Sequence, residues 1–192
     1  TATTNVGSAA IVASTSGLSA GNYDFTASST DGTLTIDKAH LTVTADNKTR
    51  LYGQANPTLT TTVSGFVNGE SASTAAGFAG AGTASTTAVA ATNVGTATIT
   101  AGAGTLAATN YDFANLTDGT LTIDKAHLTV TADNQSRLYG QANPSLTQTI
   151  SGFVNNENLA SSGVSGTALG STSATATTNV GSAAIVASTS GL

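Results

Sequence analysis

The stretch Thr33-Leu-Thr-Ile-Asp-Lys-Ala-His-Leu-Thr-Val-Thr-Ala-Asp46 decides how this chain folds. Apolar residues alternate with threonine on both sides of the charged pair Asp37-Lys38. A period of two is the signature of a half-buried β-strand. The stretch therefore predicts one strand, a joint of two residues and a second strand, so that one packed β-unit passes directly into the next.

The same stretch returns almost letter for letter as Thr120 to Asp133, about 87 residues further on. That period is wide enough for a complete small domain rather than for one coil of a solenoid of roughly 20–50 residues. The chain therefore divides into repeats. We assign residues 1–37 to the C-terminal part of one repeat, 38–124 to a complete repeat and 125–192 to the N-terminal part of the next.

A longer period is superimposed on this one. Thr1 to Leu18 and Thr175 to Leu192 are the same eighteen residues, whereas the copy that begins near Asn93 differs from both. We therefore predict a true period of two repeats, with Ser-Ala-Gly-Asn-Tyr following Leu192 as it follows Leu18.

Composition excludes several classes of function. The chain has 5 Lys and Arg against 10 Asp and Glu, a formal net charge of −5, and no basic cluster. This balance argues against nucleic acid or an anionic membrane as a partner. Cysteine is absent, which excludes disulfides and thiolate metal sites. The sequence has no run of 18 apolar residues, so we predict no membrane span in it.

The pattern along the repeat predicts a mainly β fold. Short runs of alternating apolar residues indicate several strands, Asp31-Gly32 is typical of a hairpin, and Asp118-Gly119 indicates a turn. Tyr23 and Phe25 stand at strand spacing. The segment from Glu70 to Phe78 is the least β-like and fits either one short helical turn or a loop. Two architectures remain open for each unit, an immunoglobulin-like sandwich and a β-grasp-like sheet, joined end to end in a tandem array.

No constellation of residues points to catalysis. His40 and His127 are the only histidines, one at each joint, and a lone histidine offers too few partners for a metal or an acid–base pair. We expect the rings of Tyr52 and Tyr139 to anchor a loop to the core, and each hydroxyl to have a hydrogen-bond partner. We therefore predict no enzyme, no catalytic residue, no cofactor-binding residue and no metal ligand.

The charged residues suggest two other kinds of chemistry, calcium binding and an isopeptide bond. The aspartates near the joints suggest calcium, which needs six to eight oxygen ligands, but they are spread over turns without a calcium-loop motif. Calcium at the joints is thus a secondary hypothesis. An isopeptide bond at Lys38 would need a catalytic carboxylate, and the only glutamates, Glu70 and Glu157, fall in predicted loops. The aspartates concerned are Asp31, Asp37, Asp46, Asp118, Asp124 and Asp133.

The repeated strings carry a resemblance to a known family. The opening string Lys38 to Pro57, which contains Leu-Tyr-Gly-Gln-Ala-Asn-Pro, resembles the start of MBG-type repeats marked by a Tyr-Gly-X motif. The closing strings Asn110-Tyr-Asp-Phe113 and Asp118 to Asp124 resemble the end of the same repeat. Such repeats occur in tandem in large bacterial surface adhesins and filamentous-haemagglutinin-like proteins. The segment Ser71 to Ala91 departs from them, because it is poor in proline and large apolar residues.

This resemblance implies a secreted protein at the bacterial cell surface and no catalytic residues. The leading hypothesis is a structural stalk or filament module of an adhesin or biofilm-matrix protein, which gives reach and attachment. The alternative is a repeated glycan- or mucin-binding adhesion module. The expected partners are neighbouring repeats, other copies of the chain and, in the alternative, a cell-surface glycan.

Overall fold

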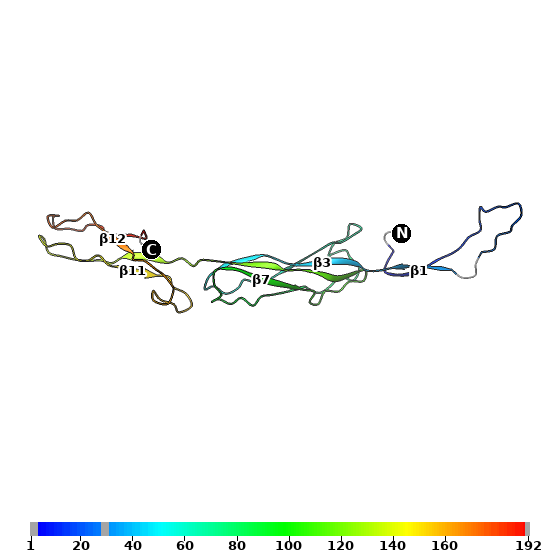
Figure 1. The fold of residues 1–192 in the computed structure, drawn as a ribbon, viewed down its shortest axis with the longest axis horizontal. Coiled ribbons are helices and arrows are strands. Elements are labelled where there is room, and N and C mark those ends of the chain that lie inside the picture. Colours follow the sequence, from blue (N-terminus) through cyan, green and yellow to red (C-terminus); the bar gives the residue numbers. More distant parts are fainter. Residues whose placement is uncertain (1–3, 28–30, 191–192) are drawn as a thin grey trace. The chain divides into compact units, whose positions relative to one another are not determined.

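A computed structural model of the chain describes residues 4–27 and 31–190. These residues form thirteen β-strands and no helix, which confirms the mainly β fold (Figure 1). Two compact units are present, and each is described by itself. Unit 1 comprises Thr1–Lys48, Pro57–Thr87 and Ala97–Leu121, and unit 2 comprises Thr49–Asn56, Ala88–Thr96 and Thr122–Leu192.

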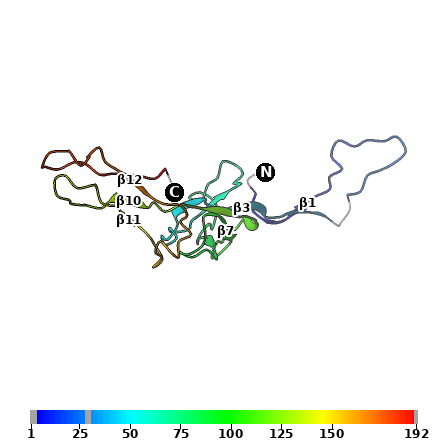
Figure 2. The same cartoon turned by 60° about the vertical axis from the view of Figure 1, so that its left-hand side comes forward.

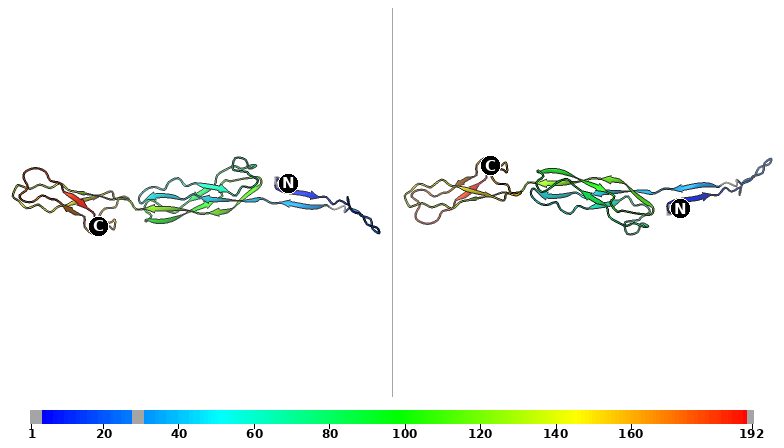
Figure 3. Two further views of the ribbon diagram at one scale, coloured as in Figure 1. Left: turned by 90° about the horizontal axis from the view of Figure 1, so that it is seen from above. Right: turned by 90° about the horizontal axis from the view of Figure 1, so that it is seen from below.

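Unit 1 contains an N-terminal strand pair. Strands β1 (Gly7–Ile11) and β2 (Gly32–Ile36) run antiparallel, with Gly7 opposite Ile36 (Figure 3). The predicted strand spacing at Tyr23 and Phe25 does not become a strand in the described residues, and these side chains are 80% and 44% exposed. The same letters do form a strand in the complete repeat, where a parallel neighbour lies beside them.

The first sheet of the complete repeat has the strand order β5-β3-β8. Its central strand β3 (Ala39–Ala45) is antiparallel to β5 (Thr61–Ser64) and parallel to β8 (Tyr111–Thr117). Burial in β3 alternates strictly, as the Leu-Thr-Val-Thr-Ala pattern predicts, because successive side chains of a strand point to opposite faces. The first strand of the repeat is thus bonded to a strand that lies far away in the sequence.

The second sheet has the strand order β4-β9-β7-β6. Its strands are β4 (Lys48–Leu51), β9 (Gly119–Asp124), β7 (Gly95–Gly102) and β6 (Thr83–Ser85). Burial alternates along β9 in the same way as along β3. The largest fully buried side chains come from strands of both sheets, an arrangement that fits a β-sandwich: Tyr111, Leu41, Ile99, Leu121, Ile123 and Val43.

The turn predicted at Asp118-Gly119 connects β8 to β9, which belong to different sheets. The Asp118 carboxylate accepts a hydrogen bond from the backbone N–H of Ala101 at 2.9 Å. A Cβ atom on Gly119 would lie only 2.3 Å from the carbonyl oxygen of Ala45. The Asp-Gly pair therefore lets the chain cross tightly from one sheet to the other. The hairpin predicted at the counterpart Asp31-Gly32 is wrong among the described residues, because Tyr23 and Phe25 form no strand and β2 pairs with β1 instead.

An aromatic cluster closes one end of the unit 1 core. Tyr111 packs edge-on against Phe66, with ring centroids 5.6 Å apart, and Phe66 in turn contacts Phe78 at 5.5 Å. Leu41 and Ala75 are buried beside these rings. Such tilted aromatic pairs stabilise a core beyond their buried area by about 0.5–1.5 kcal/mol each.

The segment before Phe78 is a hydrogen-bonded turn. The backbone N–H groups of Thr74 and Ala75 both donate to the carbonyl of Ser71, at 3.0 and 2.9 Å. The structure assigns no helix to this segment, but the two bonds form a single isolated turn of the helical type, the first of the two forms that the sequence allows. Ala75 is buried, so one small side chain of the turn packs in the core.

Unit 2 contains two separate strand pairs from the third repeat. Strand β10 (Thr129–Ala132) is antiparallel to β11 (Gln148–Ser151), and β12 (Leu169–Ser171) is antiparallel to β13 (Val186–Ser188) (Figure 2). Many large apolar side chains remain exposed here. They include Leu128, Leu138, Leu159, Leu169, Val180 and Val186.

The repeated strand offers a matched test of packing. Leu121 of β9 is fully buried, whereas Leu34, at the same place in the motif, is 53% exposed. We expect Leu121→Ala to lower the free energy of unfolding by about 2–5 kcal/mol, because it leaves a cavity. Leu34→Ala should cost less than about 1 kcal/mol. Urea unfolding followed by circular dichroism measures both, and equal losses would contradict the assignment of the core.

Candidate functional site at the joints between repeats

Asn110 is the centre of the first joint, which lies within unit 1. Its carbonyl accepts the backbone N–H of Ala39 at 3.0 Å. Its side-chain oxygen accepts the N–H of Val6 at 3.1 Å, and its side-chain nitrogen donates to Asn5 at 3.0 Å. One asparagine thus joins the segment before β1 to the start of β3, which explains the asparagine of the Asn-Tyr-Asp-Phe string.

His40 pairs with a carboxylate at the same joint. Its Nδ1 lies 2.8 Å from the Asp112 carboxylate, and the two side chains are 65% and 37% exposed. The histidine hydrogen bond holds the pKa of Asp112 below its ordinary value. Lys38 also points to this region and donates to the carbonyl of Ala108 at 3.0 Å. His127, the counterpart of His40, is exposed. These contacts place His40 and Lys38 in a surface joint.

The second joint lies within unit 2 and is made by the Tyr-Gly loop. The hydroxyl of Tyr52 donates to the Glu157 carboxylate at 2.6 Å, and the backbone N–H of Tyr52 donates to the carbonyl of Asp124 at 2.8 Å. A Cβ atom on Gly53 would lie 2.4 Å from the side chain of Val154. The loop of the complete repeat therefore contacts the glutamate and valine of the following one.

The third repeat has the same loop at Tyr139-Gly140. Gly53 and Gly140 share a φ of 84°, a conformation that favours glycine. Gly140 has nothing within 4 Å of the place where a Cβ would be, and Tyr139 is 62% exposed. The predicted hydrogen-bond partner exists for Tyr52, but the ring of Tyr139 stands in the open. The backbone thus requires glycine at both positions, and the neighbouring repeat adds a second requirement at Gly53 alone.

Sequence reasoning missed a buried arginine. Arg50 is 5% exposed and donates to Asn56 at 2.8 Å and to the carbonyls of Leu51 and Val89 at 3.1 and 2.6 Å. Asn56 continues the network by donating to the carbonyl of Ala88 at 2.6 Å. An arginine can satisfy several carbonyls at once because its planar group carries five N–H donors.

The third repeat contains the same network in a more open setting. Arg137 donates to Asn143 at 2.8 Å and to the carbonyls of Leu138 and Thr175. The signal that could have found both is the common string Arg-Leu-Tyr-Gly-Gln-Ala-Asn-Pro, whose arginine and asparagine are six residues apart. This network fixes the Tyr-Gly loop to the body of its own repeat.

Two aspartates considered for calcium bind threonine hydroxyls. Asp46 accepts from Thr60 at 2.5 Å and from Thr62 at 2.7 Å, and these hydrogen bonds hold its pKa below the ordinary value. The pKa of Asp133 is lowered in the same way by Thr147 and Thr149. Within residues 4–27 and 31–190, no group of three His, Asp or Glu side chains is placed to hold a metal ion. Calcium at the joints stays a prediction.

Comparison with known families agrees with this repeated geometry. The family model described as MBG domain (YGX type) matches residues 41–122 and again residues 128–191. The chain belongs to this family. Both matches contain the Tyr-Gly loop, at Tyr52-Gly53 and at Tyr139-Gly140. No curated protein and no solved structure matches the chain. MBG domains are repeated, adhesin-like modules typical of extracellular surface proteins.

Among the residues that the structure describes, none belongs to a helix long and apolar enough to cross a membrane.

The two glycines allow the contribution of the second joint to be measured. Both Gly53→Ala and Gly140→Ala should strain the backbone alike, because both residues have a φ of 84°. Only Gly53→Ala also forces the Val154 side chain to move. We expect this variant to lower the free energy of unfolding by about 1–3 kcal/mol more than Gly140→Ala does. Chemical denaturation compares the pair, and identical values would show that the Tyr-Gly loop makes no joint.

The hydrogen bonds between threonine and aspartate predict how the folding stability falls at acid pH. Because the folded-state pKa of Asp46 is below its ordinary value of about 3.9, its contribution is present above that pH and is lost as the pH falls through the folded-state pKa. We therefore expect Asp46→Asn to flatten the fall in thermal stability below pH 4. The double variant Thr60→Val, Thr62→Val removes the two donors and should flatten it similarly. An unchanged acid limb in both variants would contradict this role.

Proposed function

We propose that this chain is a structural spacer module of an extracellular bacterial adhesin or biofilm-matrix protein, in which it provides reach and cell-surface attachment. The observation that carries the proposal is the direct passage between strands at the joint. Strand β2 ends at Ile36 and β3 begins at Ala39, so only Asp37 and Lys38 lie between them. A joint of two residues leaves no length for a flexible linker.

The contacts at the joints support the same role. Side chains on both sides of each joint are bonded to one another, through Asn110 in unit 1 and through Tyr52 and Glu157 in unit 2. Bonded joints resist bending more than a free polypeptide does, which is what a spacer needs in order to hold a distal domain away from the cell. Membership of a family of repeated adhesin-like domains is consistent with this proposal.

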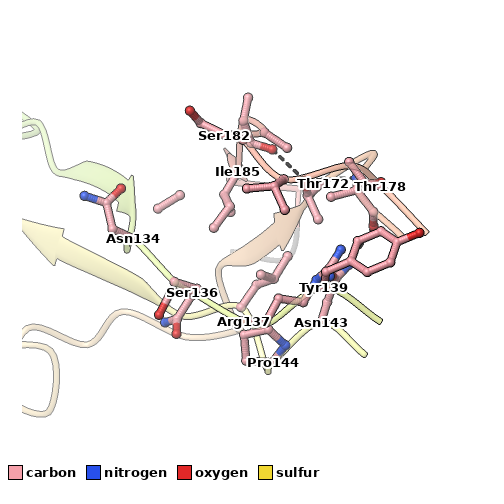
Figure 4. A pocket seen from close by; sticks show the side chains of 18 of the residues that line it. Asn134, Ser136, Arg137, Tyr139, Asn143, Pro144, Thr172, Thr178, Ser182 and Ile185 are labelled. Carbon is pink, nitrogen blue, oxygen red and sulfur yellow. Dashed lines mark hydrogen bonds between the residues drawn. The ribbon is translucent and has the colours of Figure 1, made fainter. Parts of the chain in front are cut away.

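Glycan binding is the second candidate, and one observation favours it. Tyr139 is 62% exposed, and it lines an open groove together with Asn143 and Arg137 (Figure 4). Aromatic rings beside amide groups are the usual composition of a sugar site. In the complete repeat, however, Tyr111 is 1% exposed and Tyr52 is bonded to Glu157. The aromatic residues of a fully assembled repeat are thus committed to the core and the joint, which favours the spacer.

A graft experiment separates the two candidates. In this experiment a binding domain of known affinity is displayed on cells through one or two copies of this chain. We expect the distance from the cell surface at which it captures its ligand to grow by roughly 30–45 Å for each repeat that the added copy contributes. Beads coated with the chain alone should capture no mucin. A reach independent of copy number would contradict the spacer. Saturable mucin capture that is lost in Tyr139→Ala would establish the glycan-binding module instead.

A further inference from the structure

The chain enters the complete repeat along β3 and approaches its exit along β8. Strand β3 begins at Ala39, just after Asp37 and Lys38, and β8 is the strand before the crossing at Asp118-Gly119. These two strands are neighbours in one sheet, within unit 1. A pull along the chain therefore acts on two strands that are bonded directly to each other.

The direction of the two strands decides how tension acts on them. A pull on both ends of the chain draws β3 toward Asp37 and β8 toward Gly119. Because β3 and β8 are parallel, these two forces slide the strands past each other. The hydrogen bonds of a parallel pair are evenly spaced, and sliding loads all of them together. Forces that separate two adjacent strand ends would instead break the bonds one at a time.

The bonded stretch covers most of β3. It starts where the N–H of Ala39 donates to the carbonyl of Asn110 at 3.0 Å, and the paired register continues as far as Thr44. The side chains of His40 and Asp112, opposite each other in this register, add a hydrogen bond at 2.8 Å. Sliding has to break the backbone ladder and this side-chain bond together.

The continuations of the two strands are bonded in the same order. Within unit 1 the N–H of Thr120 donates to the side chain of Asn47 at 2.7 Å. Within unit 2 the N–H of Tyr52 donates to the carbonyl of Asp124 at 2.8 Å. Both segments advance in the same direction from the first bond to the second, as β3 and β8 do. The same pull therefore loads these bonds as well.

Buried side chains add resistance to sliding. Leu41 and Val43 of β3 are fully buried, and Tyr111 of β8 is 1% exposed. The Tyr111 hydroxyl also donates to Glu70 at 2.5 Å. A slip of one residue would turn the buried side chains of a strand to the opposite face, so no favourable intermediate register exists. The strands therefore separate in one step, and the rate of that step sets the force of unfolding.

We propose that the parallel pair of β3 and β8 is a mechanical clamp, by which the repeat resists tension along the chain. The clamp keeps the repeat folded when the two ends of the protein are held by bodies that move apart. This function goes beyond the spacer role, since a spacer that is never pulled needs only length. The contacts that form the clamp all lie inside the complete repeat.

The direction of pulling gives the sharpest test. The chain has no cysteine, so introduced cysteines select where two polymer tethers of an atomic force microscope attach. The pair Asp37→Cys, Lys125→Cys pulls along the native path, and the pair Asp37→Cys, Thr109→Cys separates the adjacent starts of β3 and β8. All three positions are exposed. Residues 1–36 and 126–192 lie outside the tethers and carry no load.

Unfolding along the native path is recognised by its length, because it releases at most about 310 Å of chain at ~3.5 Å per residue. We expect the rupture force in this direction to be several-fold higher than that for the pair at 37 and 109, at the same pulling speed. Equal rupture forces in the two directions would overturn the clamp. The reach measured in the graft experiment does not depend on the rupture force, so the clamp and the spacer can fail separately.

Side-chain variants test the bonded stretch itself. Asn47→Ala removes the acceptor of the Thr120 N–H, whereas Asn47→Asp keeps an oxygen there. Thr105→Val is the matched control, because the Thr105 hydroxyl accepts the N–H of Ala81 at 3.1 Å, away from both loaded strands. We expect only Asn47→Ala to lower the rupture force along the native path. A force that all three variants lower alike, or that none of them changes, would overturn the proposal.

Discussion

The parallel pairing of β3 with β8 is the constraint on which the repeat depends. A parallel pair cannot be closed by a tight turn, and here the connection runs from Ala45 to Tyr111, through most of the repeat. The central strand therefore lacks one neighbour until the end of the repeat is in place. Tyr23 and Phe25 have no such parallel neighbour, and they form no strand among the described residues. A neighbouring strand, and not local propensity alone, thus decides which segments become strands.

Arg50 shows how a repeat with few large side chains fixes a loop. Only 5% of the residues are aromatic, so aromatic side chains alone cannot cover the ends of the sheets. Instead a buried guanidinium bonds to Asn56 and to two backbone carbonyls. Charge-assisted hydrogen bonds are stronger than neutral ones, and buried carbonyls require donors in any case. The network holds the Tyr-Gly loop in the shape that contacts the following glutamate.

Much of the fold could be predicted from the sequence, and the failures have physical causes. Alternation along residues 33–46 located β2, the joint and β3, because a period of two is a local property. The dipeptide at Asp31-Gly32 was misassigned as a hairpin, because the same dipeptide at Asp118-Gly119 serves a tight crossing between two sheets. The pairing of Tyr52 with Glu157 was missed, since a contact between residues 105 positions apart leaves no local pattern. Arg50 was missed although its partner Asn56 is only six residues away, because the sequence does not show that the arginine is buried. The identity of the family, by contrast, was carried by the Tyr-Gly string itself.

The second joint has a consequence for how such a gene changes length. Every group that makes it, Tyr52 and Gly53 on one side and Val154 and Glu157 on the other, lies in a string that recurs in each repeat. Recombination between near-identical DNA copies removes or adds whole repeats in register. Such an event would bring the same four residue types together at the new junction. Each new junction would therefore have the same contacts as the one that it replaces. The length of the protein can then vary between generations with no compensating mutation at the junction.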